Sequence, residues 1–316
     1  MITRACLIFC VLAPLGLTVL LQHYPSKALP EFNPALEMLG DAQRDVSRAG
    51  HKLTPFSTEW EIKIGDAIAK SMEEWGWSGG WFSARIVPAP AYITEVGDAL
   101  IPYVRRKDIP YRFHVVESEA INAYSVAGGH IYITRGLLAI TKSEAELATI
   151  LGHEIAHVDL RHCIDQVKAH VVADRVGGQI LRDIAGLASE LFRAGFNKKE
   201  ELHADSLGVQ LAGRAKYYPD SFLKIYERME SNGPAPEKIG PPKTPVEEIK
   251  RGISGALDEY FQTHPPSARR LAQIQRVIAR DRYTRRGRFY VGAVNYEKQC
   301  SRTHWTTVKE WVVKSD

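Results

Sequence analysis

Apolar side chains recur at helical spacing along much of the chain. From residue 59 they repeat every three or four positions until the Trp-Gly-Trp run at 75–77, where the pattern stops. Ser143 stands at a helix N-cap position, and Glu146, three residues later, is typical of a capping box. Further helices are predicted over 91–104, 141–172, 175–213 and 266–278. The chain is therefore expected to be mostly helical.

Alternating, β-rich stretches between the second and third predicted helices indicate strands. Residues 111–116 alternate between apolar and polar side chains, and 123–126 and 130–134 flank the pair Gly128-Gly129. We expect a small antiparallel sheet with a turn or bulge at the glycine pair. Together with the helices, this pattern predicts an α+β fold whose sheet lies beside the helix over 141–172.

The first 28 residues have the features of an export segment. Residues 5–21 carry no charged side chain, follow Arg4, and precede Ser26-Lys27-Ala28, which fits a small-x-small cleavage site. This stretch is slightly shorter than a helix that spans a bilayer. We expect a secretory signal peptide, with an N-terminal membrane anchor as the alternative. Either reading predicts an exported protein, periplasmic or membrane-associated, whose folded part lies outside the cytoplasm.

The rest of the chain is expected to have three parts. Residues 29–57 are punctuated by prolines and predict a lead-in segment, 58–285 predict the main domain, and 286–316 predict a C-terminal tail. No second run approaches 18 uncharged apolar residues, which argues against several membrane spans. The Pro- and Gly-rich stretch 232–247 predicts a long loop of the kind that often forms a lid.

Composition excludes several classes of protein without naming one. With 45% hydrophobic and 25% charged residues, the chain has the composition of an ordinary globular enzyme. Its net charge of +4 is too small to indicate nucleic-acid binding. No Cys-x-x-Cys pair occurs, so a cysteine-based zinc or redox site has no support. Cys163 and Cys300 form a disulfide in an oxidising compartment or remain two free thiols.

Residues 153–157 read His-Glu-Ile-Ala-His inside the predicted helix 141–172. A spacing of four puts both imidazoles on one helix face, where they can bind one zinc ion at about 2.0–2.1 Å. Zinc lowers the pKa of a bound water to about 7, and the adjacent Glu154 carboxylate can take the proton of that water as general base. Apolar residues before the motif, such as Leu147 and Ile150, indicate a buried helix rather than a solvated one.

A third protein ligand decides the class of such a site. The metzincin pattern needs Gly and His three and six residues after the second histidine, where this chain has Leu160 and Cys163. A carboxylate from a later helix is the remaining option. Glu201 can ligate while Asp205, on the same helix face, accepts a hydrogen bond from a ligand histidine. Glu200 is the alternative ligand, although it lies five residues from Asp205.

Two other histidines near these motifs are not expected to be ligands. On a continuous helix His162, five residues after His157, would point about 140° away from it. His203 lies two residues after Glu201 and therefore on another helix face.

Four motifs, taken together, resemble the zinc metallopeptidase family of the CAAX-prenyl endopeptidases and the bacterial HtpX and BepA proteases. The motifs are Asn122-Ala123 with Gly128-Gly129 and Thr134-Arg135-Gly136-Leu137-Leu138; His-Glu-x-x-His at 153–157; Glu-x-x-Ala-Asp at 201–205; and Thr263-His264-Pro265-Pro266 with Arg270. The resemblance covers about 59–280. The soluble, exported BepA-like branch is closer, because HtpX-like members carry several membrane helices.

The resemblance implies a gluzincin endopeptidase in which His153, His157 and Glu201 bind one Zn²⁺ per chain. His264 matches a family histidine near the metal that acts as a transition-state donor or a switchable fourth ligand. Arg270 matches the basic partner in the family's catalytic machinery. Both are therefore expected to belong to the catalytic site.

The expected function is zinc-dependent hydrolysis of peptide bonds in protein or peptide substrates. The resemblance alone implies misfolded or membrane-associated substrates and a role in protein quality control of the cell envelope. The alternative is a metal-containing chaperone or assembly factor whose minor proteolysis is gated by the loop 232–247. The presence of Glu154 favours hydrolysis, since a pure binding protein needs no base. Prenyl-protein processing is disfavoured because that reaction uses a chamber of membrane helices.

The segment 124–134 predicts a strand edge for the substrate. Proteases commonly bind an extended peptide by adding it to an exposed sheet edge. On this hypothesis Gly128 and Gly129 let the substrate backbone come close, and Asn122 belongs to the same edge.

Overall fold

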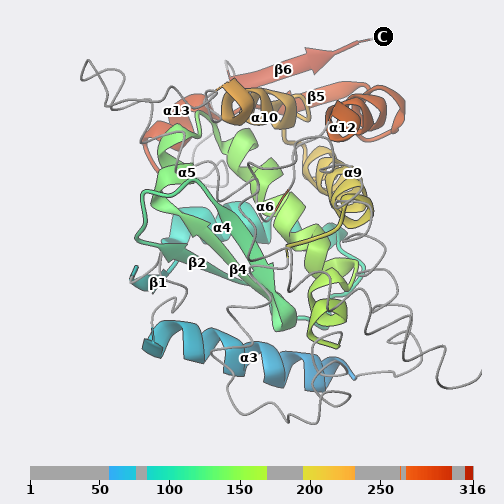
Figure 1. Ribbon diagram of the computed structural model, residues 1–316. Helices are drawn as coiled ribbons and strands as arrows, with labels where there is room; N and C mark the ends of the chain where they lie inside the picture. Colours follow the sequence, from blue (N-terminus) through green and yellow to red (C-terminus); the bar gives the residue numbers. More distant parts are fainter. Residues whose placement is uncertain are drawn as a thin grey trace, which may run out of the picture. The chain divides into compact units, whose positions relative to one another are not determined.

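The computed structural model describes residues 57–75, 84–168, 195–231, 264, 268–300 and 310–315. The expected export segment, nearly all of the lead-in and the loop 232–247 lie outside these residues. The described part of the chain forms helices packed around a four-stranded and a two-stranded sheet (Figure 1), which confirms the α+β, mostly helical fold. None of its helices combines the length and the apolar character needed to cross a membrane.

The larger sheet has mixed strand directions. Its strands are β1 (Ile86–Pro88), β2 (Arg112–Val116), β3 (Ala123–Val126) and β4 (His130–Thr134), in the order β1-β2-β4-β3. β2 runs parallel to β4, whereas the β1/β2 and β3/β4 pairs are antiparallel. The expectation of a purely antiparallel sheet was therefore wrong. Alternation along a strand determines which residues share a face, but not which neighbour the strand pairs with.

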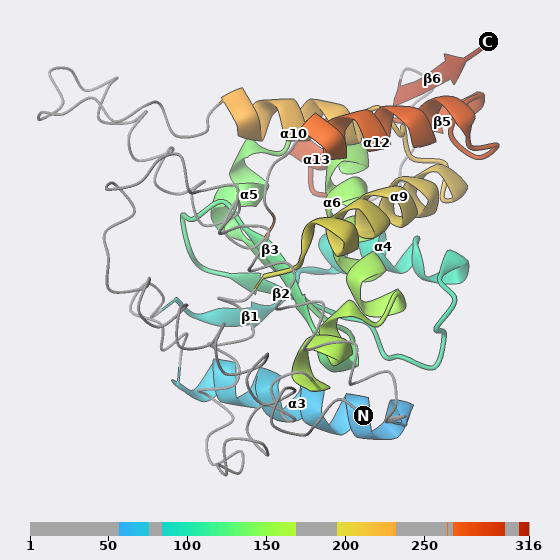
Figure 2. The same ribbon diagram turned by 45° about the vertical axis from the view of Figure 1, so that its right-hand side comes forward.

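Alternate residues of the strands face two different helical layers. Phe113 and Ile131 join the core that includes α4 (Ala91–Asp98) and α6 (Glu144–Asp159). Tyr132, one residue further, joins a second core that includes α3 (Thr58–Trp75). Figure 2 shows α3 on the other face of the sheet. The sheet is thus enclosed between α3 and the pair α4–α6, and its α6 face carries Ser125 toward that helix.

The glycine pair after β3 is covered by the protein itself. Gly128 and Gly129 lie in a short 3-10 turn, η5 (Ala127–Gly129), with φ of 78° and 91°. A Cβ on Gly65 of α3 would lie 2.0 Å from the Ala127 carbonyl oxygen, and a Cβ on Gly129 would lie 2.6 Å from Ile109 Cγ2. The glycines therefore permit close packing of α3 and the 109–110 loop. This corrects the expectation that they admit a substrate backbone.

Helix α6 begins as its sequence predicts and ends earlier. The Ser143 hydroxyl accepts the Glu146 backbone N–H at 3.2 Å. The Glu146 carboxylate accepts the Lys142 N–H and pairs with Arg228 on α10 (Ser221–Ser231), so the second half of the capping box is shifted by one residue. The helix ends at Asp159, because Arg161 has a left-handed φ of 67°, and helical structure resumes over 162–168. The predicted single helix 141–172 is therefore interrupted.

Helix α9 (Lys198–Arg214) crosses α6 at two glycines. A Cβ on Gly208 would lie 2.9 Å from the His153 backbone nitrogen, and one on Gly152 would lie 3.0 Å from the Gly208 carbonyl oxygen. Only glycine fits at both positions without moving the helices apart. This close crossing brings the 153–157 turn of α6 next to the first turns of α9. Of the predicted helix 175–213, the part before 195 lies outside the described residues.

The C-terminal segment packs against the start of α6. Two first-turn N–H groups of that helix, on Glu144 and Ala145, donate to the carbonyl oxygens of Gly292 and Val291. The remaining elements are η4 (Ile101–Tyr103), α5 (Arg135–Ile140), α12 (Ala268–Arg280), α13 (Ala293–Glu297) and the antiparallel pair β5 (Gly287–Tyr290) and β6 (Trp311–Lys314). Within the predicted C-terminal tail 286–316, the described residues form β5, α13 and β6, and Val291 and Gly292 contact the start of α6. Cys163 is buried and Cys300 half-buried, and the two are not bonded to each other.

Candidate metal centre and active site

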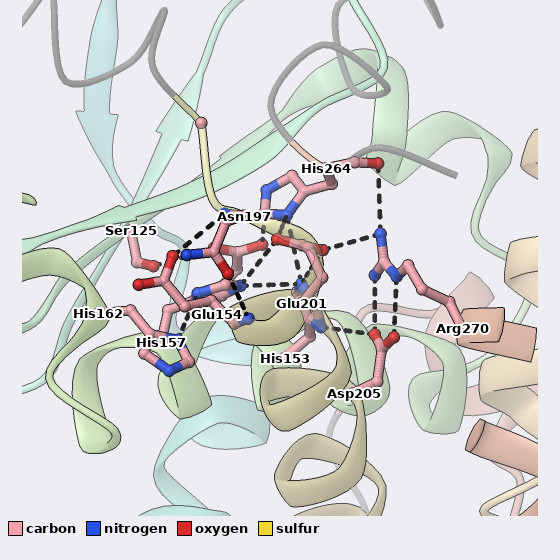
Figure 3. A network of polar contacts seen from close by, with 12 residues as sticks. Ser125, His153, Glu154, His157, His162, Asn197, Glu201, Asp205, His264 and Arg270 are labelled. Atoms are coloured by element: carbon pink, nitrogen blue, oxygen red, sulfur yellow. Dashed lines mark hydrogen bonds and ion pairs between the residues drawn. The ribbon is translucent and has the colours of Figure 1, made fainter. Parts of the chain in front are cut away.

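Four buried side chains converge where α6 meets α9. His153 and His157 come from consecutive turns of α6, Glu201 comes from the first turn of α9, and His264 lies just before α12 (Figure 3). Each residue offers one ligand atom, and these atoms lie within 4.8 Å of one another. In the described part of the chain, this is the group of histidine and acidic residues that could hold a metal ion.

The spacing of these atoms suits a tetrahedral metal ion. Two ligand atoms that each lie about 2.0–2.1 Å from a tetrahedral zinc are roughly 3.3 Å apart. The His153 and His157 Nε2 atoms are 3.2 Å apart, and Glu201 Oε1 lies 3.4 Å from His157 Nε2. His264 Nδ1 lies 3.3 Å from His153 Nε2 and 3.0 Å from Glu201 Oε1. The ligand atoms therefore need little rearrangement to close around an ion.

The charges around the group also favour a dication. Glu154, Glu201 and Asp205 bring three buried carboxylates to the site, whereas Arg270 brings one guanidinium. The acidic side chains thus outnumber the fixed cation in a buried region, where an uncompensated charge is costly. Protonated histidines or a bound Zn²⁺ would offset this excess. The side chains fit a divalent metal by spacing, ligand type and charge.

Arg270 and Asp205 form a bidentate ion pair behind the ligands. Arg270 Nε and Nη2 lie 2.8 and 2.7 Å from the two Asp205 oxygens, and its Nη1 lies 2.8 Å from Glu201 Oε2. Asp205 Oδ1 in turn lies 3.1 Å from His153 Nδ1. The predicted Asp205 contact to a ligand histidine is therefore present in the structure. Arg270 touches the carboxylates from behind and orients them, rather than facing the space between the ligands.

Burial and these contacts set the protonation of the ligands. Burial lowers the pKa of His157 well below its ordinary value, which keeps the imidazole neutral. Burial also disfavours a charged His153, but the hydrogen bonds and charges of Asp205 and Glu201 outweigh it and raise the pKa to about 9. Burial alone would raise the pKa of Glu201, whereas the Arg270 and His264 charges hold it well below the usual range. Glu201 is therefore a carboxylate, as a metal ligand must be.

Glu154 lies beside the four ligands without being one of them. Its Oε2 accepts a hydrogen bond from Ser125 Oγ at 3.0 Å, and its Oε1 lies 3.6 Å from His264 Nε2. The Cys163 thiol lies 3.6 Å from the Ser125 hydroxyl on the far side. Sequence reasoning missed Ser125; its only sequence signal is a polar residue within an otherwise apolar strand.

His264 connects the ligand group to the sheet. Its Nδ1 faces Glu201, and its Nε2 lies 3.3 Å from the Ala123 carbonyl oxygen of β3. The Arg270 Nη1 group donates to the His264 carbonyl oxygen at 3.2 Å, which fixes the backbone beside α12. His264 therefore lies against the candidate ligands, Glu154 and the edge strand at once.

The edge-strand hypothesis survives only for β3. β4 is hydrogen-bonded on both sides, to β2 and β3, so the segment 130–134 cannot accept a peptide. β3 lies at the end of the sheet, although its Ala123 and Ser125 carbonyls contact His264 and Cys163. The Asn122 backbone pairs inward with Thr134 and not outward.

Glu200 and Glu201 have distinct tasks. The Glu200 carboxylate accepts the Asn197 N–H at 3.1 Å, and the Asn197 side chain accepts the N–H groups of Lys199 and Glu200. This capping box starts α9 and turns Glu200 away from the ligands, so the alternative ligand is excluded. The sequence Asn-x-x-Glu at 197–200 is typical of a capping box. It was not recognised because it lies inside the longer predicted helix 175–213.

His162 lies closer to the site than the sequence predicted. Its Nδ1 is 3.0 Å from His157 Nδ1, since the left-handed Arg161 ends the helix and redirects the chain. The expectation that it points away was wrong because it assumed a continuous helix. His203 is exposed on another face of α9, as expected.

Comparison with known proteins agrees with this geometry. A profile of peptidase family M48 matches residues 89–278. The mitochondrial metalloendopeptidase OMA1 of Schizosaccharomyces pombe is 25% identical over 71% of this chain and 63% of its own length. The beta-barrel assembly-enhancing protease of Yersinia pestis is 28% identical over 62% of this chain and 42% of its own length. The matches thus cover less than two thirds of the length of these relatives.

Proposed function

Because this chain belongs to peptidase family M48, we propose that it is a zinc-dependent endopeptidase that holds one zinc ion per chain. The observation that carries the proposal is the convergence of His153, His157, Glu201 and His264, with Glu154 beside them and outside the set. His153, His157 and Glu201 are the proposed protein ligands. A water or substrate occupies the fourth position in catalytic zinc sites.

In this proposal Glu154 moves the proton. Zinc, when bound, supplies Lewis-acid activation of a water molecule and of the peptide carbonyl group. Glu154 Oε2 is engaged by Ser125, so Oε1, which faces the ligands, takes the proton of the attacking water. The same oxygen then gives that proton to the leaving amine nitrogen. Ser125 keeps the carboxylate from rotating away.

His264 and Arg270 have supporting roles in the proposal. His264 Nδ1 is within the ligand group, and in that position it acts as a fourth ligand of the resting enzyme. Once displaced, its imidazole is close enough to donate a hydrogen bond to the developing oxyanion. Arg270 keeps Glu201 and Asp205 charged and oriented.

The substrate is proposed to bind along β3 as an added strand. β3 is the terminal strand beside the ligand group, and His264 Nε2 lies against its Ala123 carbonyl. A peptide that pairs with this carbonyl would displace His264 from it. Binding of substrate and opening of the fourth metal position are thus coupled in the proposal.

The proposed substrates are misfolded or membrane-associated proteins of the cell envelope. The N-terminal sequence has the pattern of an export signal or anchor. One relative is named as a beta-barrel assembly-enhancing protease and another as a mitochondrial metalloendopeptidase. We propose that the enzyme acts outside the cytoplasm, periplasmic or membrane-associated, in protein quality control.

The position of His264 also supports the second candidate, a chaperone or assembly factor with gated proteolysis. A site closed by four protein ligands has no position left for water. If this closed state dominates, binding of client proteins is the main activity and cleavage is minor. The two candidates differ in whether protein clients are cut by the isolated enzyme.

Metal content and casein cleavage of the purified full chain test the proposal. One zinc per chain, with cleavage that stops in a chelator and returns with added zinc, is the expected result. One zinc without cleavage would favour the gated second candidate. Folded protein that neither retains nor takes up zinc would overturn the metal site.

A further inference from the structure

The two ligand histidines of α6 are held from behind by different partners. The His153 Nδ1 atom faces the Asp205 carboxylate, which Arg270 neutralises. The His157 Nδ1 atom lies 3.0 Å from Nδ1 of a second histidine, His162 (Figure 3). Both members of this imidazole pair are buried.

The protons of this pair can be assigned from its geometry. The Nε2 atom of His157 faces the other ligands, at 3.2 Å from His153 Nε2 and 3.4 Å from Glu201 Oε1. A ligating nitrogen carries no proton, so a neutral His157 must carry its proton on Nδ1. That N–H points at His162 Nδ1, which therefore accepts the hydrogen bond and bears no proton itself. His162 is then the tautomer with its proton on Nε2.

We infer that His162 is a positioning residue that fixes the tautomer and ring orientation of His157 and thereby maintains metal affinity. Partners of this kind orient ligating histidines and increase their basicity. The inference rests on the proposed metal site and adds to it a residue outside the His-Glu-x-x-His motif.

The local chain path is built for this contact. Asp159 is the last residue of α6, and the left-handed φ of Arg161 lets residue 162 return toward the preceding turn. Phe196 stacks on a face of the His157 ring, with centroids 3.6 Å apart. The ring is thus held in one plane by Phe196 and in one rotation about its axis by His162.

Replacement of His162 separates a hydrogen-bond role from a packing role. Asn places an amide oxygen near the Nδ1 position of histidine, whereas Leu fills similar space without an acceptor. In a competition titration of the metal-free full chain with a chromophoric zinc chelator, His162→Leu should weaken zinc binding by about 10- to 100-fold and His162→Asn by no more than about 3-fold. The exposed neighbour His203, whose ring stacks at 6.4 Å from that of His162, provides the control His203→Leu, with wild-type affinity.

The titration has clear contrary outcomes. Wild-type affinity in His162→Leu, or equal weakening in His162→Leu and His162→Asn, would overturn the inference. If the wild-type chain binds no zinc at all, the proposed function fails first, which is a distinguishable result.

A measurement on the unmodified protein covers the case in which His162→Leu does not fold. In ¹⁵N-histidine NMR spectra of the zinc-loaded wild-type chain, His157 should show a protonated Nδ1, and His162 a bare Nδ1 with a protonated Nε2. A proton on Nδ1 of His162 would contradict the assignment, because that atom could then not accept the hydrogen bond.

Discussion

The hydroxyl of Ser125, on the edge strand β3, donates a hydrogen bond of 3.0 Å to Oε2 of Glu154, on helix α6. Ser125 reaches it because alternate residues of β3 face α6, and both side chains are buried. One contact thus fixes the proposed base relative to the strand on which the substrate is proposed to bind.

Removal of that hydroxyl should impair turnover more than substrate binding. Hydrogen bonds to charged groups contribute about 1.5–3 kcal/mol, so Ser125→Ala should lower kcat by about 10-fold or more. KM and zinc content should stay close to wild type. Steady-state kinetics on a peptide substrate measure both parameters. Ser125→Thr, which keeps a hydroxyl, should retain most of the activity, and a Ser125→Ala enzyme with unchanged kcat would contradict the role.

Arg270 should be important for stability, because it pairs with two buried carboxylates. Arg270→Met leaves Glu201 and Asp205 without their cation, and loss of one partner of a buried ion pair costs about 3–5 kcal/mol. Urea unfolding of the metal-free protein measures the change. The adjacent exposed residue supplies the control, since Arg269→Met should change the free energy of unfolding by less than about 0.5 kcal/mol. Equal effects of the two substitutions would contradict the account.

Gly65→Ala should destabilise the protein although it lies inside helix α3. At an open helical position this change is stabilising by about 1 kcal/mol. Here the new Cβ would lie 2.0 Å from the Ala127 carbonyl oxygen. Overpacking of this kind costs about 1–3 kcal/mol, measurable by urea unfolding. A stabilised Gly65→Ala protein would show that α3 does not cover the glycine pair.

His114 should make the fold sensitive to acid. Burial, followed by the charges of His130 and Arg112, lowers the pKa of His114 from 6.5 to about 4. Between these values the unfolded chain binds a proton at this residue and the folded chain does not, so stability falls as the pH falls through that range. His114 also faces Glu73 of α3, and its neighbour His130 faces Asp66 of the same helix.

A substitution isolates this contribution. His114→Gln cannot take up the proton, so its free energy of unfolding should fall less than that of the wild type between pH 7 and pH 4. Urea unfolding of both proteins in chelator removes any contribution from metal loss. Parallel pH profiles would contradict the assignment to His114.

The local features of the site were predictable from the sequence because they depend on neighbours along one helix. The spacing of His153 and His157, and the Ser143 cap, follow from helical geometry alone. The parallel pairing of β2 with β4 was not predictable, since alternation does not specify the neighbouring strand. The contact of His162 with His157 was not predictable for a different reason. A single left-handed residue, Arg161, ends the helix, and an arginine side chain does not predict a left-handed backbone.

Contacts between distant segments account for the remaining differences. Glu200 and Glu201 are equivalent in composition and differ only in the helical phase set by the Asn197 cap. From the sequence alone, Gly128 and Gly129 are compatible with a substrate groove as well as with close packing. In the folded chain Gly65 of α3 packs against this turn. Such contacts become visible only when the chain is folded.

The substitution Glu154→Gln tests whether Glu154 is the base of a zinc peptidase. Zinc content and casein cleavage are measured side by side for the variant and the wild-type full chain. Both proteins should hold one zinc per chain, and the cleavage rate should be about 10²- to 10⁴-fold lower in the variant. A Glu154→Gln protein that keeps its zinc and cleaves at the wild-type rate would contradict the account.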